Sequence, residues 1–228
     1  MTEAGRGDGD GDVYTAPRAG SAALVLIDVQ RDFYEDDAPL PVAGTKQALG
    51  PMARLAAAFR AAGLPIVHVI RLYRADGSNV DLVRRAEIEG GAQIVAPGSA
   101  GSQIAPELLP EPTVLDHDAL LRGDLQRLGE REHVLYKSRW GAFYGTVLEA
   151  HLRGQGIDTV VFAGCNFPNC PRTSVYEASE RDFRVVLVAE AMSGVYERGL
   201  EECRRIGVRV WDLGETEKWL ATGAGGRA

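Results

Sequence analysis

Three residues with different chemistry, Asp28, Lys137 and Cys170, follow predicted strands of this chain. A thiol at the first turn of a helix is favoured as the thiolate, which attacks carbonyl carbon. A neighbouring carboxylate can accept the thiol proton and return it to a leaving amine, and a lysine adds positive charge. The three residues together predict acyl transfer with Cys170 as a nucleophile of depressed pKa.

The segment from Gly164 to Cys170 connects a predicted strand to a helix. A sharp turn of this kind aims backbone amides at one point, where an oxyanion can develop. Asn166 and Cys170 are the candidate donors. Cys165 ends an apolar strand and Cys203 lies in a predicted helix, so both are interpreted as structural, and Cys165 and Cys170 lack the spacing of a redox CxxC pair.

Predicted strands alternate with predicted helices along the chain, beginning with an apolar run suited to a strand covered on both faces. The strands are expected at 22–27, 64–70, 133–136, 159–163, 184–188 and 208–211, and the helices at 49–59, 143–152, 170–181, 195–206 and 215–220. This alternation predicts an α/β fold with three α/β/α layers and an open, mainly parallel six-stranded, Rossmann-like sheet. Ligands of such sheets bind beyond the carboxyl ends of the strands, where the three reactive residues converge.

Composition excludes several classes of protein. The 228 residues carry 25 Lys and Arg against 32 Asp and Glu, a net charge of −7, so nucleic acid and anionic membranes are not expected partners. No apolar stretch approaches the roughly 20 residues of a membrane-spanning helix, and no signal peptide is apparent, which predicts a cytoplasmic protein. Three cysteines are an odd number, which argues against a disulfide scaffold.

One domain over 21–220 is expected, with a flexible leader over 1–20 and a flexible tail over 221–228, because both ends are rich in Gly and offer little apolar area to bury. The run over 90–112 has no helical period and is the expected contact between subunits.

The chain resembles the isochorismatase-like cysteine hydrolases, which include nicotinamidases and N-carbamoylsarcosine amidohydrolase. Three segments carry the resemblance: LIDVQRDF at 26–33, YKSRWGAFYGT at 136–146, and GCNFPNC at 164–170 followed by Thr173 and Ala178. The resemblance implies an Asp28, Lys137 and Cys170 triad, a cis peptide between Cys165 and Asn166, and oxyanion donors at Asn166 and Cys170. It also implies self-association as a dimer or tetramer.

The same resemblance implies a substrate pocket walled by Phe33, Trp140 and Tyr176, with polar discrimination from Asn166 or Asn169. Four arginines, Arg71, Arg74, Arg84 and Arg85, are candidates for a clamp on a substrate carboxylate, but the favoured interpretation is a solvated basic face.

Nicotinamidases of this family hold a metal with an Asp-x-His pair and a further histidine beside the second strand. Here that stretch is VIRLYRAD at 69–76, and the four histidines, His68, His117, His133 and His151, show no ligand spacing. We therefore expect no metal and no cofactor, and interpret His68, inside an apolar strand, as a core histidine with a hydrogen-bond partner.

The leading hypothesis is a metal-independent cysteine amidohydrolase that cleaves a small amide or N-carbamoyl compound through a thioester. Two alternatives remain open. One is an isochorismatase-type vinyl-ether hydrolase in which Asp28 protonates the substrate, and the other is a catalytically inactive binding subunit on the same fold. The presence of Cys170 favours the amidohydrolase.

Overall fold

The computed structural model describes residues 13–224, which form a seven-stranded sheet with helices on both faces. The strands are β1 (Ala22–Ile27), β2 (Ile66–Ile70), β3 (Gln126–Gly129), β4 (Glu132–Tyr136), β5 (Thr159–Gly164), β6 (Arg184–Met192) and β7 (Arg209–Trp211). The helices are α1 (Thr45–Ala61), α2 (Leu82–Glu89), α3 (His117–Leu121), α4 (Leu148–Arg153), α5 (Cys170–Ser179), α6 (Glu197–Arg205) and α7 (Leu213–Ala224). The predicted α/β class is confirmed.

The strand order is β3-β4-β2-β1-β5-β6-β7, and all pairs are parallel except β3 with β4. The chain leaves β1 toward β2 on one side, and β5 joins β1 on the other, so the direction of strand addition reverses beside β1. In open parallel sheets, this is the place where ligands bind.

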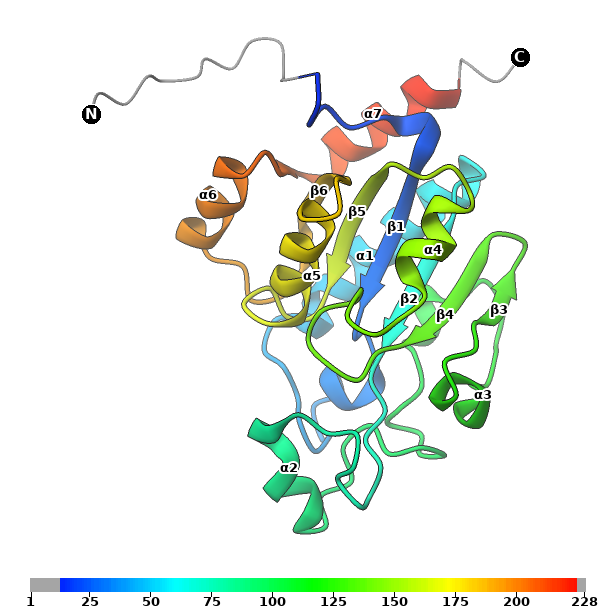
Figure 1. Cartoon of the computed structure of the whole chain (residues 1–228), viewed down its shortest axis with the longest axis vertical. Coiled ribbons are helices and arrows are strands. Elements are labelled where there is room, and N and C mark those ends of the chain that lie inside the picture. Colours follow the sequence, from blue (N-terminus) through cyan, green and yellow to red (C-terminus); the bar gives the residue numbers. More distant parts are fainter. Residues whose placement is uncertain (1–12, 225–228) are drawn as a thin grey trace.

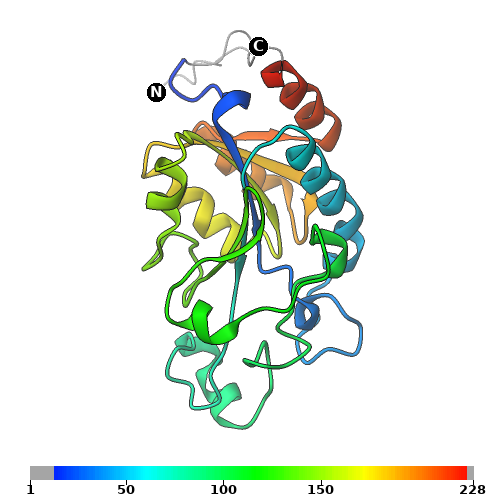
Figure 2. The ribbon, with the colours of Figure 1, turned by 90° about the vertical axis from the view of Figure 1, so that its right-hand side faces the viewer.

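The layers follow from the alternation of side chains along buried strands. Ala22, Leu24 and Leu26 of β1 pack in a core with α1 and α7, whereas Val25 and Ile27 face α4, α5 and α6. Figure 2 shows α1 and α7 on one side of the sheet and α4 and α5 on the other. All six residues of β1 are buried, as expected for a strand covered on both faces.

Several predicted boundaries differ from the structure. The sheet has seven strands rather than six, because the short antiparallel β3, whose residues are only partly buried, was not recognised. Helix α4 begins at Leu148 rather than near 143. The predicted start of the domain at residue 21 is too late, because Arg18 donates a 3.1 Å hydrogen bond to Asp158 and Ala19 is buried.

The predicted tail differs in the same way. Helix α7 continues beyond Leu220 to Ala224, and Gly223 lies close against Ala19. The last part of the predicted tail, 225–228, and the first part of the predicted leader, 1–12, lie outside the described residues. The flexibility expected there remains a prediction.

The carboxyl edge of the sheet carries the irregular segments of the chain, and Figure 1 shows α2 projecting there, at the end away from α7. Two side chains that follow β1 hold the 90–112 run in place. Gln30 donates to the backbone oxygens of Arg71 and Ser102 at 2.7 and 2.8 Å, and Asp32 accepts a 2.6 Å bond from the Val95 amide. These bonds fix the edge of the sheet next to Asp28.

His68 is a buried histidine of β2, and its Nε2 lies 2.7 Å from Glu132 Oε1. Arg60 donates two further hydrogen bonds to the same carboxylate. The prediction of a core histidine with a partner is confirmed. No helix within residues 13–224 has the length and apolar character needed to cross a membrane.

Candidate functional site

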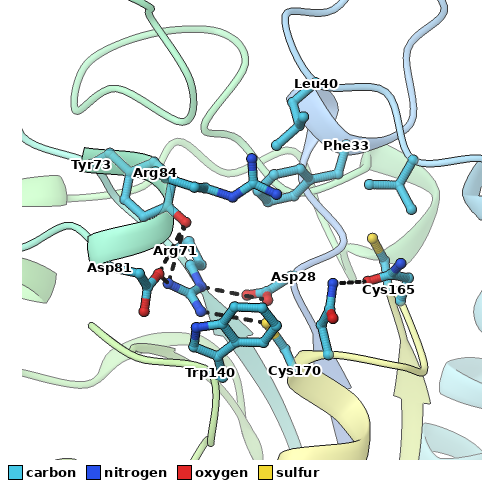
Figure 3. A pocket seen from close by; sticks show the side chains of 13 residues that line it. Asp28, Phe33, Leu40, Arg71, Tyr73, Asp81, Arg84, Trp140, Cys165 and Cys170 are labelled. Atoms are coloured by element: carbon cyan, nitrogen blue, oxygen red, sulfur yellow. Dashed lines mark hydrogen bonds and ion pairs between the residues drawn. The ribbon is translucent and has the colours of Figure 1, made fainter. Parts of the chain in front are cut away.

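Four strand ends supply the side chains of the candidate site. Asp28 directly follows β1, Arg71 follows β2, Lys137 follows β4, and Cys170 begins α5 beyond β5. Because these strands are parallel neighbours, their carboxyl ends meet, and the four side chains come together from positions more than 140 residues apart. All four are buried. Figure 3 shows Asp28, Arg71 and Cys170 on the same side of the pocket.

The carboxylate of Asp28 is held on one oxygen only. Lys137 Nζ donates a 2.8 Å hydrogen bond to Asp28 Oδ2, and the Lys137 side chain is fully buried. Among the described residues, Asp28 Oδ1 is buried without a hydrogen-bond partner. This oxygen is therefore free to accept a proton.

The backbone fixes both members of this pair. The Asp28 amide donates to Val69 O at 2.8 Å, and the Lys137 amide donates to Ile70 O at 3.0 Å, which ties each residue to the end of β2. Asp28 has a φ of 54°, in the left-handed region that non-glycine residues seldom occupy. A residue held in such a conformation indicates that the surrounding structure determines its position.

Arg71 is the site residue that the sequence interpretation placed wrongly. Its guanidinium is buried rather than solvated, with Nη2 3.5 Å from Cys170 Sγ and Nε 3.8 Å from Asp28 Oδ2. Nη1 donates to the Asp81 carboxylate and, at 3.2 Å, to Tyr73 Oη. Two carboxylates thus surround this cation, which compensates for its loss of water.

The electrostatics of Cys170 contradict the prediction of a depressed pKa. Burial raises the pKa of the Cys170 thiol, and the nearby negative charge of Asp28 raises it further, whereas Lys137 and Arg71 lower it. The balance lies above the ordinary value, because loss of water and one carboxylate together outweigh the two cations. The resting thiol is therefore protonated near neutral pH.

The other two thiols are also buried and free. Burial raises the pKa of Cys165 to about 12, and burial raises the pKa of Cys203 as well. Cys165 lines the pocket, whereas Cys203 belongs to α6 and packs in the core on the α4, α5 and α6 side of the sheet.

The loop before α5 brings two backbone amides to the site. The peptide bond between Cys165 and Asn166 is cis, as the resemblance implies. Cys165 donates to Ile27 O at 2.9 Å and Phe167 donates to Ser193 O at 2.8 Å. Among residues 13–224, the amides of Asn166 and Cys170 have no hydrogen-bond acceptor. Both amides therefore remain available as donors.

Gly164 makes the close approach of this loop to β1 possible. It has a φ of 127°, and a Cβ atom there would lie 2.3 Å from Ile27 O. A residue with a side chain at this position would displace β5 from β1. Because glycine has no Cβ atom, Gly164 lets β5 lie close to β1, and Cys170 and Asp28 come together at the same edge of the sheet.

The pocket at this edge has an empty volume of about 420 Å³, partly open to solvent. Of the predicted lining residues, Phe33, Trp140, Asn166 and Asn169 do line it. Residues not predicted as lining are Leu40, Val42, Arg71, Tyr73, Asp81, Arg84 and Cys165, of which Arg71 and Arg84 stand out in the sequence only as part of a basic group. Their sequence signal was weak because most belong to irregular segments.

Tyr176 does not line the pocket, which corrects one predicted site residue. It lies six residues after Cys170 on α5, a spacing that turns it to a different face of the helix. There the Arg172 guanidinium lies 5.7 Å from its ring centroid.

The residues beside β2 do not fit a metal ion of the kind that the resembled nicotinamidases hold. Arg71 places a buried positive charge between Asp28 and Asp81, the two nearest carboxylates. Among the described residues, no group of three or more His, Cys, Asp or Glu side chains is placed to hold a metal.

Comparisons with known proteins identify the family of the fold. The family model described as the isochorismatase domain matches residues 22–204. A protein of Arabidopsis thaliana named as a probable inactive nicotinamidase is 29% identical over 90% of this chain and 100% of its own length.

Two solved structures are similar to the whole fold. The crystal structure of an isochorismatase family protein from Desulfovibrio vulgaris matches with a TM-score of 0.76 and 33% identity, over 88% of this chain and 98% of the other. That of an N-carbamoylsarcosine amidase from Thermoplasma acidophilum matches with a TM-score of 0.65 and 26% identity, over 85% and 96% of the two chains. This chain belongs to the isochorismatase family.

Proposed function

We propose that this isochorismatase-family amidohydrolase cleaves a small amide or N-carbamoyl compound through a thioester on Cys170, without a metal. The observation that carries the proposal is the relation between Cys170 and Asp28. The thiol lies at the pocket beside a buried carboxylate, one oxygen of which is held by Lys137 while the other has no partner among the described residues. A neutral thiol beside a carboxylate oxygen without a partner is suited to attack with simultaneous proton transfer.

In the first half of the proposed reaction, Cys170 Sγ forms a bond to the substrate carbonyl carbon as its proton passes to Asp28. The carbonyl electron pair moves to oxygen, and the amides of Asn166 and Cys170 stabilise the resulting oxyanion. When the intermediate collapses, the carbon–nitrogen bond breaks and the amine or ammonia leaves with the proton from Asp28. A thioester remains on Cys170.

In the second half, water attacks the thioester and Asp28 accepts one proton from it. The carbon–sulfur bond then breaks, the acid product leaves, and the sulfur recovers its proton from Asp28. Lys137 keeps Asp28 oriented in both halves through its 2.8 Å hydrogen bond. Arg71 stabilises negative charge on sulfur, because its Nη2 lies 3.5 Å away.

The test is hydrolysis of a panel of primary amides, N-carbamoyl compounds, nicotinamide and isochorismate by the wild type, Cys170→Ala and the control Cys203→Ala. We expect turnover of an amide or carbamoyl compound that Cys170→Ala abolishes and Cys203→Ala retains. A covalent adduct of the substrate acyl group on Cys170, found by mass spectrometry, would support the thioester. Full amide turnover in Cys170→Ala would refute it.

Two other outcomes assign a different function. Turnover of isochorismate alone, unaffected by Cys170→Ala but lost in Asp28→Asn, would indicate acid catalysis by Asp28. A Cys170 that reacts with no substrate and no alkylating reagent would indicate a binding subunit. Because a relative is named as a probable inactive nicotinamidase, and because the residues beside β2 do not fit a metal, we expect no turnover of nicotinamide.

A further inference from the structure

The charges around the pocket do not balance. Asp28 and Asp81 are its carboxylates, and Arg71, Arg84 and the underlying Lys137 are its cations. Lys137 is paired with Asp28, and Arg71 is paired with Asp81 and also lies near Asp28. The thiol of Cys170 stays neutral because its pKa is raised by burial. Among the residues that line the pocket, Arg84 is therefore the one cation without a carboxylate partner within it.

The Arg84 guanidinium is poorly satisfied within the chain. Its ion-pair partner is Glu87, one turn along α2, at 3.7 Å, which is too long for a hydrogen bond. Among the described residues the guanidinium donates no hydrogen bond, and 31% of the side chain is exposed. Its donors are therefore free to bind an anion that enters the pocket.

Arg84 also lies in a suitable place for a substrate group remote from the reaction. In the view of Figure 3 its guanidinium reaches across the pocket, on the side opposite Asp28 and Cys170. Apolar side chains, Phe33, Leu40, Val42 and Trp140, line the same pocket. A ligand that fits has a carbonyl at Cys170, an apolar middle and an anionic far end.

We propose that Arg84 forms an anion subsite, so that the pocket takes a small carbonyl compound with a carboxylate remote from the reacting carbon. The guanidinium binds that carboxylate through its forked donors. That the reacting group is an amide or carbamoyl rests on the proposed function; the anion subsite rests on the geometry and charge of the pocket. Arg84 is accordingly a specificity-determining residue.

The first experiment measures binding of ketones, which are not hydrolysed. The probes are pyruvate, 4-oxopentanoate and 6-oxoheptanoate, each beside the neutral analogue in which CH₂OH replaces the carboxylate. Dissociation constants are measured by ligand-observed NMR for the wild type, Arg84→Gln, Arg84→Lys and Arg74→Gln. Arg74 is the matched control because it is exposed, lies nearby in the chain and does not line the pocket.

We expect at least one carboxylate to bind the wild type about fivefold or more tightly than its neutral analogue, since a charge-assisted hydrogen bond at a partly exposed site contributes on that scale. Arg84→Gln should remove the preference, Arg84→Lys should keep part of it, and Arg74→Gln should keep it. Added salt should weaken carboxylate binding and leave the neutral analogues unaffected. No preference at any length, or a preference that survives in Arg84→Gln, would overturn the subsite.

A second measurement separates this inference from the proposed reaction. Hydrolysis of succinamate and of neutral succinamide is followed in the same variants. A rise in KM for succinamate alone in Arg84→Gln would support both the subsite and the amidase reaction. If neither compound is hydrolysed while the carboxylate preference persists, the anion subsite stands and the proposed reaction loses its support. Equal turnover of succinamide and succinamate would contradict the anion subsite and leave the proposed amidase reaction supported.

Discussion

Arg71 Nη2 lies 3.5 Å from the sulfur of Cys170, inside a pocket wall where the sequence suggested a solvated arginine. The contact gives the thiol a second cation besides Lys137. Both cations lower the pKa of Cys170, although burial and Asp28 keep it above the ordinary value. Arg71 therefore supports the developing negative charge on sulfur when the thiol loses its proton.

Replacing Arg71 with Met should raise the pKa of the Cys170 thiol further and slow its alkylation by iodoacetamide near neutral pH. The buried Asp81 would lose its ion-pair partner, and breaking a buried pair from one side costs about 3–5 kcal/mol of stability. Chemical denaturation and a pH profile of the alkylation rate measure the two effects separately.

The double variant Arg71→Met/Asp81→Asn is the control for stability. It removes the unpaired carboxylate, so it should recover much of the lost unfolding free energy while the thiol stays slow to react. Alkylation of Arg71→Met at the wild-type rate at every pH would show that Arg71 does not act on the thiol.

Gly164→Ala should destabilise the protein by about 2–4 kcal/mol, as expected for a strained backbone together with a steric clash. The new Cβ would lie 2.3 Å from Ile27 O and 2.6 Å from Ile27 N, in backbone that cannot yield without separating β5 from β1. Because Asp28 follows Ile27 and Cys170 follows this loop, turnover should fall by more than the loss of folded protein explains.

Gly156→Ala provides the matched control. Gly156 also has a positive φ, 73°, but a Cβ atom added there would have no neighbour within 4 Å among the described residues. The substitution should therefore cost only the conformational penalty of about 1–2 kcal/mol, with turnover per folded molecule unchanged. Equal losses in the two variants would show that the contact with Ile27 is not what makes Gly164 necessary.

His133 and His151 should make stability depend on pH. Their ring centroids lie 4.8 Å apart, and His133 Nδ1 is buried without a partner among the described residues. Burial lowers the pKa of both histidines below the ordinary 6.5. The positive charge of Arg127 lowers the pKa of His133 further, although Glu132 raises it. His133 in turn lowers the pKa of His151. The unfolded chain therefore binds more protons than the folded chain as pH falls through about 6.5.

The free energy of unfolding should accordingly be highest above that value and fall as the pH is lowered through it. Thermal melting between about pH 7.5 and pH 5.5 measures the decline. His133→Gln/His151→Gln should make the decline shallower, because His117 is then the remaining histidine whose pKa burial lowers. A decline as steep as in the wild type would assign the acid sensitivity to other groups.

Much of the fold was predictable because its signals are local. The continuous apolar run of β1 reflects burial of the strand on both faces. The 3.6-residue apolar period of α1 reflects burial of the helix on one face. Asp28, Lys137 and Cys170 were predictable as a group because Asp28 and Lys137 directly follow strands and Cys170 begins the helix after one. Strand β3 was missed because four half-buried residues at the edge of a sheet have no distinctive pattern.

The features of the site that the sequence did not predict depend on residues from other segments of the chain. Arg71 resembles a surface residue in sequence, since its burial is stabilised by Asp28 and Asp81, which other segments supply. The direction of the Cys170 pKa shift likewise depends on depth of burial, which the helix start and the nearby lysine do not reveal. Tyr176 was placed in the pocket by resemblance, whereas the turn of α5 directs it elsewhere.

Thiol reactivity and amide turnover should change in opposite directions when Asp28 is replaced. Asp28→Asn removes a negative charge whose effect is to raise the pKa of Cys170, while Lys137 and Arg71 remain to lower it. Iodoacetamide should therefore alkylate Cys170 faster in Asp28→Asn than in the wild type near pH 7. Amide turnover should nevertheless fall by at least about a hundredfold, because the proton acceptor for the thiol and donor for the amine is lost.

Lys137→Met should have the opposite effect on the thiol, since it removes a cation, and it should slow both alkylation and turnover. Cys203→Ala serves as the labelling control, with peptide mass mapping to confirm that the modified residue is Cys170. Near-UV circular dichroism checks that Asp28→Asn keeps its packing despite the buried Lys137 that loses a charged partner. If Asp28→Asn slowed alkylation, or kept full turnover, Asp28 would not be the base for Cys170, and the pairing of the two across the ends of β1 and β5 would be structural.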